Sequence, residues 1–250
     1  MKKLSIGISD FKELISEDYY YVDKTLLIKE LIDASGKVVL LTRPRRFGKT
    51  LNLSMLKYFF DTTETSNRHL FEDKAIWKEY KYQKFQGKYP VILLTFKGVK
   101  EHNWQDCYEK LVDIIANEFN KHNYLLNNLS TYYKDKYQSI LEKKANKAVM
   151  ENSILFLTEL LQKHYNNNVI VLLDEYDNPI HAAYHNGYYS EIITFMHSLL
   201  EYTFQDNIYL HRGFITGALR VAQDKESIFT GFDEDMLLDF FPVTIKRMWV

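Results

Sequence analysis

Four short runs of apolar residues divide the chain into a repeating pattern, and each run is bounded by polar or turn-forming residues. They lie at residues 37–42, 90–96, 169–174 and 208–216. The first three consist almost entirely of Val, Ile and Leu instead of alternating with polar residues, which is typical of parallel strands that are covered on both faces. The pattern therefore predicts four strands of a mostly parallel sheet.

Longer segments with helical periodicity lie between and beside these runs. They cover residues 50–60, 104–122, 153–165 and 191–204. Strands that alternate with helices are typical of βαβ units, so we expect an α/β fold with a mostly parallel sheet flanked by helices. Residues 118–150 interrupt the alternation, and we interpret them as a helical insertion.

The insertion is locally basic. Between Phe119 and Met150 the chain has six lysines, two acidic residues and four tyrosines. Such a surface could bind nucleic acid. A solvated helix pair that uses its tyrosines for packing explains the same composition, and we favour that interpretation.

Composition narrows the class of protein. With 250 residues, 46% of them hydrophobic and 26% charged, the chain can bury a sizeable core. Its net charge of −1 gives no global attraction to nucleic acid or membranes. The one cysteine, Cys107, excludes an intramolecular disulfide and a cysteine-based zinc site. Neither a signal-peptide core nor an apolar run long enough to span a membrane is found, so we expect a cytoplasmic protein.

The stretch TRPRRFGKT at residues 42–50 follows the first predicted strand and precedes a predicted helix. Strand, loop and helix in this order form a P-loop, in which backbone N–H groups and the positive end of the helix bind phosphates. Gly48 lets the backbone approach the phosphates, Lys49 reaches the β- and γ-phosphates, and the hydroxyl of Thr50 binds Mg²⁺. We therefore predict an ATP site with magnesium.

Arg43 departs from the usual pattern, because it occupies the position of the first glycine. Together with Pro44 it could form a stiffer opening turn. The loop holds four cations within seven residues, which raises its affinity for a polyphosphate; the alternative is a basic surface loop that precedes a helix. The predicted nucleotide-binding residues are Arg43, Pro44, Arg45, Arg46, Phe47, Gly48, Lys49, Thr50 and Leu51.

The third apolar run ends in two carboxylates, Asp174 and Glu175, within VIVLLDEYDNPI. Burying two acids after a strand is costly unless a metal or a cation neutralises them. We predict that Asp174 completes the magnesium shell with Thr50, and that Glu175 polarises the attacking water. The alternative is a strand exit with solvated acids.

The arrangement of the strands adds two further candidates. One strand, 90–96, lies between the two motifs in the sequence, which matches the additional-strand division of P-loop ATPases. In that arrangement the strand at 208–216 also ends near the γ-phosphate, so Thr216 is a candidate sensor and Arg220 a candidate cation acting in cis. Either residue could instead cap a helix or pair with an acid.

Two histidines in HAAYHNGYY, His181 and His185, would lie one helical turn apart and could form a metal pair. No third ligand is visible in the sequence. We therefore favour solvated or capping histidines.

Several segments together resemble the bacterial AAA-ATPase-like proteins, which are described as predicted AAA family ATPases. The matching segments run in the family's order from about Ile6 to Gly231. They are IGISDFKELISEDYYYVDKTLLIKELI, LLTRPRRFGKTLNLSMLKYFF, YPVILLTFKG, VIVLLDEYDNPI and ITGALRVAQDKESIFTG. The resemblance implies that the arginine-containing loop is the family's regular P-loop variant.

The resemblance also implies a domain organisation. Residues 1–36 would pack on the core, with Asp23 and Lys24 placed just before the first strand, where the segment would lie near the nucleotide base. Residues 37–231 would form the ATPase domain. Relatives usually continue into a domain resembling PD-(D/E)xK nucleases. Residues 232–250 depart from the family, and we expect them to be the start of a lid or linker at a truncated end.

Two functions fit these motifs. The first is a Mg²⁺-dependent ATPase that drives a conformational switch, with Glu175, Lys49, Thr216 and Arg220 as its catalytic residues. The second is a non-hydrolysing, nucleotide-gated adaptor for a nuclease-like domain or nucleic acid. A kinase is a weaker third possibility, because the paired acids favour water as the acceptor. Association into an oligomer is compatible with either of the first two.

Overall fold

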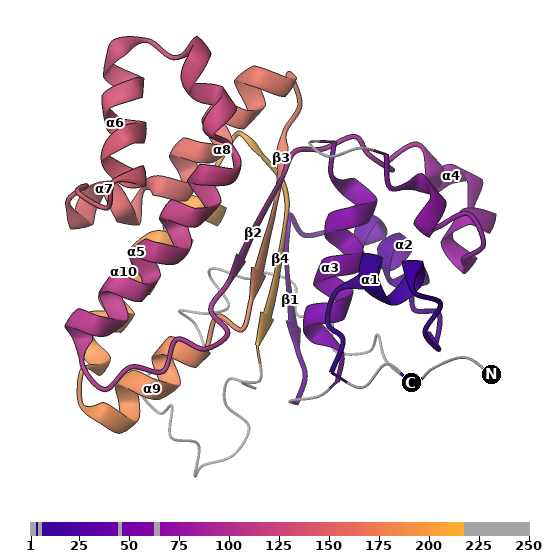
Figure 1. Cartoon of the computed structure of the whole chain (residues 1–250), viewed down its shortest axis with the longest axis horizontal. Coiled ribbons are helices and arrows are strands. Elements are labelled where there is room, and N and C mark those ends of the chain that lie inside the picture. Colours follow the sequence, from indigo (N-terminus) through magenta and orange to yellow (C-terminus); the bar gives the residue numbers. More distant parts are fainter. Residues whose placement is uncertain (1–3, 5–6, 45–46, 63–65, 218–250) are drawn as a thin grey trace.

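A parallel sheet lies between two layers of helices (Figure 1). The structure is a computed structural model that describes residue 4 and residues 7–44, 47–62 and 66–217. Its strands are β1 (Val38–Thr42), β2 (Val91–Thr95), β3 (Val169–Asp174) and β4 (Leu210–Gly217). All neighbouring strands pair in parallel, in the order β1-β4-β3-β2. The expected α/β fold with a parallel sheet is thus confirmed.

The strand order differs from the order in the sequence. In space β4 lies between β1 and β3, whereas β2 lies at the far edge. The strand at 90–96 therefore separates the two motifs only along the chain, and the strand that separates them in the sheet is β4. Each connection between parallel strands must cross a face of the sheet, so neighbours in sequence need not be neighbours in space.

The strands are apolar throughout because both faces of the sheet are covered. All six residues of β3 are buried. Along β1, Val38 and Leu40 join one hydrophobic cluster, while Val39 and Leu41 join another on the opposite face. This alternation follows from the pleat, which points successive side chains to opposite sides.

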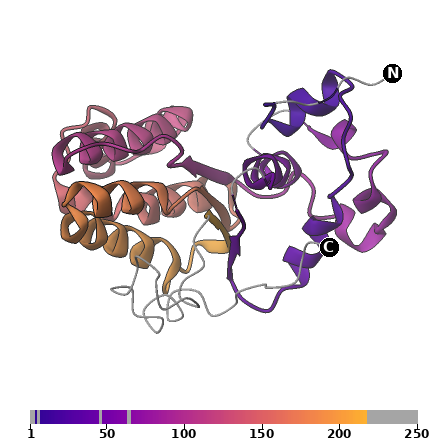
Figure 2. The ribbon, with the colours of Figure 1, turned by 90° about the horizontal axis from the view of Figure 1, so that it is seen from below.

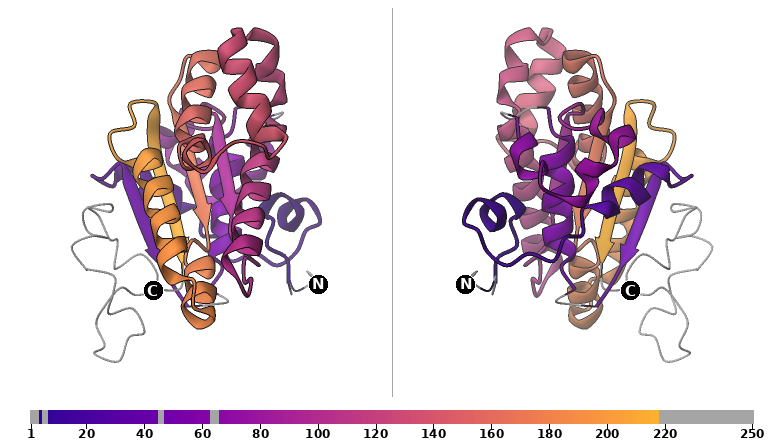
Figure 3. Two further views of the ribbon diagram at one scale, coloured as in Figure 1. Left: turned by 90° about the vertical axis from the view of Figure 1, so that its left-hand side faces the viewer. Right: turned by 90° about the vertical axis from the view of Figure 1, so that its right-hand side faces the viewer.

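The first helical layer holds the N-terminal part of the chain (right-hand view of Figure 3). It contains α1 (Phe11–Ser16), α2 (Leu26–Asp33), α3 (Lys49–Phe60) and α4 (Tyr80–Gln83), with the 3₁₀ turns η1 (Arg68–Leu70) and η2 (Ala75–Lys78). The backbone N–H of Phe11 donates to Ser54 Oγ at 2.9 Å, and Asp10 accepts from the hydroxyl of Tyr58 at 2.8 Å. These bonds tie α1 to α3, the helix that follows the glycine-lysine-threonine loop.

The placement of Asp23 and Lys24 differs from the expectation. They do not lie just before β1, because α2 comes between them and the strand. The carboxylate of Asp23 accepts from Thr25 N–H at 2.8 Å and from Ala75 N–H at 2.7 Å. Asp23 therefore joins the N-terminal segment to η2.

The second layer covers the other face of the sheet, and Figure 2 shows the sheet between the two layers. It contains α5 (Trp104–Lys121), η3 (Asn123–Asn128), α6 (Thr131–Leu141), α7 (Lys147–Glu151), α8 (Ser153–Tyr165), α9 (Asn178–Asn186) and α10 (Tyr189–Phe204). The predicted start of the insertion, residue 118, falls inside α5. This helix continues to Lys121 because its apolar side packs on the sheet, with Ile115 and Phe119 fully buried.

Tyrosines of the predicted insertion take part in packing. Tyr137 is fully buried and donates its hydroxyl to the carbonyl of Phe119 at 2.6 Å. The ring of Tyr133 stacks on that of Phe156, with 5.6 Å between the ring centroids. These two aromatic side chains serve the hydrophobic core instead of forming a free stacking platform.

The lysines of the same segment are largely paired with acids. Their partners are Asp113 for Lys143 (2.6 Å), Glu142 for Lys144 (2.7 Å) and Glu151 for Lys147 (3.7 Å). The local basic excess in the sequence is therefore reduced by acids that lie partly outside the segment. This pairing favours a solvated helix pair over a nucleic-acid surface.

None of the helices in the described ranges is long and apolar enough to cross a membrane.

Candidate functional site

The carboxyl ends of the parallel strands meet at one edge of the sheet, the lower edge in Figure 1, which we call the carboxyl edge. There β1 leads into the loop before α3, β3 ends at Asp174, and β4 ends at Gly217. Open α/β sheets bind their ligands at this edge. The two sequence motifs therefore meet where a ligand site is expected.

Gly48 makes the turn from the loop into α3. Its φ of +72° lies in the left-handed region, which favours glycine because it has no Cβ. Gly48 is the N-cap of α3, so Lys49 and Thr50 occupy the first two helical positions. The free N–H groups and the positive end of the helix dipole at this point favour an anion such as phosphate.

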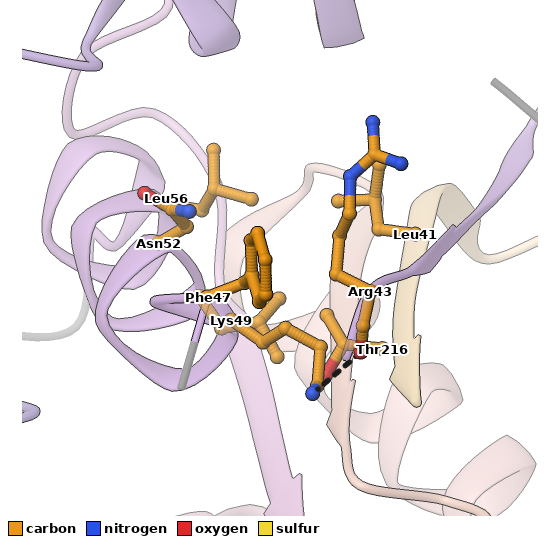
Figure 4. A pocket seen from close by; sticks show the side chains of 8 residues that line it. Leu41, Arg43, Phe47, Lys49, Asn52, Leu56 and Thr216 are labelled. Atoms are coloured by element: carbon orange, nitrogen blue, oxygen red, sulfur yellow. Dashed lines mark hydrogen bonds between the residues drawn. The ribbon is translucent and has the colours of Figure 1, made fainter. Parts of the chain in front are cut away.

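Lys49 brings a largely buried cation to the carboxyl edge. Its side chain donates to the carbonyl oxygen of Arg43 at 2.9 Å (Figure 4). It also donates to the carbonyl oxygen of Pro44 at 3.1 Å, and the residue is 9% exposed. The N–H of Arg43 in turn donates to the carbonyl of Gly217 at 3.1 Å, which anchors the loop to β4. Carbonyls are neutral, so a phosphate would be a stronger acceptor for this ammonium group.

Asp174 joins three elements of the site. Its Oδ2 accepts from the hydroxyl of Thr50 on α3 at 2.7 Å, and its Oδ1 accepts from the hydroxyl of Thr216 on β4 at 2.5 Å. Asp174 is 1% exposed, and both of these partners are neutral. A buried carboxylate among neutral hydroxyls is a strong site for a cation, because desolvation makes its charge costly.

Glu175 leaves the strand in a left-handed conformation with φ +50°. The next residue, Tyr176, donates its N–H to the carbonyl of Thr216 at 3.2 Å. The side-chain amide of Asn178 donates to Glu175 Oε2 at 2.5 Å. The chain thus turns sharply after β3, and Glu175 is half-buried beside Asp174.

A hollow lies next to the loop, between α3 and the ends of β1 and β4 (Figure 4). Half of its lining residues are apolar, two are cationic and two are neutral and polar; the residues are Leu41, Arg43, Phe47, Lys49, Asn52, Leu53, Leu56 and Thr216. Phe47 is 62% exposed at its rim. The hollow belongs to the same site as the predicted phosphate loop.

The structure brings together seven predicted site residues whose positions have been described: Arg43, Phe47, Lys49, Thr50, Asp174, Glu175 and Thr216. Pro44 and Gly48 shape the loop, and Leu51 is partly buried against the core on α3. Arg45, Arg46 and Arg220 lie outside the described residues, as do residues 232–250.

His181 and His185 both lie on α9. His181 Nε2 is 3.6 Å from a carboxylate oxygen of Asp177, and the ring of His185 packs edge-on against Tyr184. The described part of the chain contains no group of three or more His, Cys, Asp or Glu side chains that could hold a metal ion.

Sequence reasoning missed two polar residues of this edge. Asn178 binds Glu175, and the i, i+3 spacing between them was the signal that could have identified it. Asn52 lines the hollow one helical turn after Gly48, and it is 7% exposed. Its spacing from the loop could have indicated a side chain facing the loop.

These features define the class of protein. The parallel sheet, the strand β4 between the two motif strands, and the loop that caps α3 are those of a P-loop NTPase of the additional-strand type. The chain belongs to the family described as predicted AAA-ATPase, whose model matches residues 5–229. Membership of this family implies nucleotide binding.

A relative comes from Azotobacter chroococcum mcd 1, where it is described as an uncharacterized protein in the vnfD 5′ region. It is 31% identical over 184 residues, which cover 72% of this chain and 30% of the relative. The chain thus spans less than a third of that protein's length. No solved structure matches this chain.

Proposed function

We propose that the chain binds ATP with Mg²⁺ at the carboxyl edge and hydrolyses it to drive a conformational switch. The observation that carries the proposal is the hydrogen bond between Thr50 and Asp174, formed across 124 positions of sequence beside the buried Lys49. A hydroxyl and a carboxylate are hard oxygen ligands, so they suit magnesium. Two protein ligands suffice, because Mg²⁺ takes its remaining ligands from phosphates and water.

Each residue of the site has a role in this proposal. Lys49 leaves the loop carbonyls to bind the β- and γ-phosphates, while the N–H groups at the start of α3 hold the phosphate oxygens. Thr50 and Asp174 hold the metal ion. Bound Mg²⁺ supplies neutralisation of the charge on the phosphate oxygens.

Glu175 orients the attacking water and accepts its proton. The water oxygen bonds to the γ-phosphorus in line with the bridging oxygen, whose bond to that phosphorus breaks. ADP leaves with the bridging oxygen, and inorganic phosphate carries the oxygen from water. In this proposal Thr216 senses the γ-phosphate, and its hydrogen bond to Asp174 supports that role.

The proposed conformational switch is supported by the contacts between α3 and the N-terminal segment. Lys49 is the first residue of α3, and Asp10 and Phe11 form hydrogen bonds with side chains of this helix. A movement of the loop when phosphate binds would therefore be transmitted through α3 to the N-terminal segment. The nuclease-like domain and nucleic acid stay proposed partners, as does a second copy of the chain. A cytoplasmic location is also part of this proposal, in keeping with the buried Cys107.

The first test is isothermal titration of ATP with Mg²⁺ into the chain and its Lys49→Ala variant. We expect binding in the wild type and its loss in the variant. Lys57→Ala, on the same helix, is the matched control and should bind as the wild type does. Absence of binding in the wild type would overturn the proposal.

Phosphate release separates hydrolysis from the adaptor function. If Glu175 orients water, the rate of phosphate release should fall by about 100-fold or more in Glu175→Gln. ATP binding should be kept in this variant. Glu191→Gln, an exposed acid on α10, is the control. Equal and negligible release from both variants and the wild type would instead support the non-hydrolysing adaptor.

A further inference from the structure

Asn178 makes two hydrogen bonds to Glu175, the residue proposed to orient water. Its backbone N–H donates to the carbonyl of Glu175 at 3.1 Å, and its side-chain amide donates to Glu175 Oε2 at 2.5 Å. Glu175 itself has a φ of +50°, a backbone conformation that costs a non-glycine residue about 1 kcal/mol or more. Backbone and side chain of Glu175 are thus both held by one residue.

We propose that Asn178 is a positioning residue that fixes the carboxylate of Glu175 for attack by water. The amide occupies Oε2, which leaves Oε1 to accept a hydrogen bond from the water. This inference rests on the proposed hydrolysis. Asn178 acts through Glu175 and need not touch the nucleotide.

The surroundings of Asn178 hold it in place. It is 8% exposed at the first position of α9, directly after the buried Asp177 and before Pro179. Proline at the second helical position fixes its own φ near −65° and restricts the residue before it. The side chain of Asn178 is short and buried, so its amide group has few other orientations.

An amide suits this task better than a cation. A lysine or arginine at the same distance would neutralise the carboxylate and weaken it as a proton acceptor. The neutral amide of Asn178 orients the group by one hydrogen bond and leaves its charge in place. The buried Glu118 in α5 shows the contrasting case, because it is bound by Lys121 at 2.5 Å.

The test is steady-state ATP hydrolysis by the full chain and two variants, Asn178→Ala and Asn178→Asp. Both remove the donor. Asn178→Asp keeps the size of the side chain but places a second carboxylate beside Glu175, so Asn178→Ala is the variant that reports the loss of the donor alone. We expect kcat to fall about tenfold or more in both variants while KM and ATP affinity by titration stay unchanged.

Two comparisons separate positioning from a general structural effect. Asn186→Ala removes an amide at the other end of α9, where it donates to Ala182 O at 2.7 Å, and it should keep the wild-type kcat. The double variant Glu175→Gln/Asn178→Ala should be no slower than Glu175→Gln alone, because the two residues act as a unit.

Three results would overturn the inference. Wild-type kcat in Asn178→Ala would show that the amide donor does not matter. A loss in the double variant that equals the product of the two single losses would show that Asn178 acts independently of Glu175. ATP binding without turnover dependent on Glu175 would remove the proposed hydrolysis, and this inference with it.

Discussion

Two buried carboxylates, Asp174 at the carboxyl edge and Glu118 in the helical layer, illustrate how neighbours decide the role of an acid. Asp174 is 1% exposed and Glu118 is 2% exposed. Asp174 accepts from two hydroxyls, those of Thr50 and Thr216. Both residues satisfy hydrogen bonds, yet they differ in how their charge is balanced.

Glu118 is bound by a cation, a histidine and the backbone. Lys121 lies at 2.5 Å, His122 Nε2 at 3.6 Å, and the N–H of Leu93 donates to Glu118 at 3.1 Å. Leu93 belongs to β2, an edge strand of the sheet that the described residues form, so Glu118 accepts a hydrogen bond from a backbone donor beside which no described strand lies. Glu118 therefore has a structural role, because it accepts the hydrogen bond of this backbone N–H at the edge of the sheet.

The comparison teaches that burial alone does not mark a functional acid. Among the described residues, the hydrogen-bond partners of Asp174 are neutral hydroxyls, so a bound cation can neutralise its charge, whereas Glu118 already has a cationic partner. We therefore expect substitutions of Asp174 to affect ligand chemistry and substitutions of Glu118 to affect stability.

The largest effect is expected for Asp174→Asn. Removing a metal ligand should lower Mg²⁺-dependent ATP turnover by about 100-fold or more. The free energy of unfolding without nucleotide should stay the same or rise, because the change removes a buried charge whose partners among the described residues are neutral. Phosphate release and urea unfolding measure the two effects. Marked destabilisation together with normal turnover would reverse the comparison.

Glu118→Ala should show the opposite behaviour. The variant leaves the N–H of Leu93 without an acceptor and removes a buried side chain, so the free energy of unfolding should fall by about 2–4 kcal/mol. ATP affinity of the folded fraction should be unchanged. Urea unfolding and titration at low temperature check both points, with the exposed Glu109→Ala on the same helix as the control. Wild-type stability would contradict the role given to Glu118.

Thr216→Val tests the hydroxyl group that donates to Asp174. It removes a donor to a charged acceptor, which should cost about 1–2 kcal/mol of unfolding free energy and also lower turnover. Thr203→Val is the control, because Thr203 is equally buried but donates to the neutral carbonyl of Leu199 at 2.6 Å. Only Thr216→Val should change turnover. Equal turnover in the two variants would exclude Thr216 as a sensor.

The smallest effect concerns acid stability. Burial raises the pKa of Glu118, but His122 and Lys121 lower it more strongly, so the net pKa lies below its ordinary value. A lowered pKa in the folded state gives stability that is present above about pH 4.5 and is lost as the pH falls further. The difference in unfolding free energy between wild type and Glu118→Gln should thus shrink between pH 6 and pH 3. A constant difference would contradict this linkage.

The sequence by itself determined the elements and the chemistry of the loop. Runs of Val, Ile and Leu identified β1, β2 and β3, because a strand covered on both faces has no polar side, and the mixed apolar run at 208–216 identified β4. The boundaries shifted by one or two residues, as for β4, which ends at Gly217. Gly48, Lys49 and Thr50 were recognisable because the turn, the cation and the hydroxyl are consecutive in the chain.

Only the tertiary structure decided which distant residues meet. The order β1-β4-β3-β2 brings Thr216 to Asp174, although 42 positions separate them. The packing of α6 beside α5 pairs Lys143 with Asp113 from another segment, which local charge counting could not anticipate. Periodicity reports which face of an element is buried, whereas contacts across the sheet depend on the path of each crossover. The balance of charge around Asp174 and Glu118 is therefore a property of the fold.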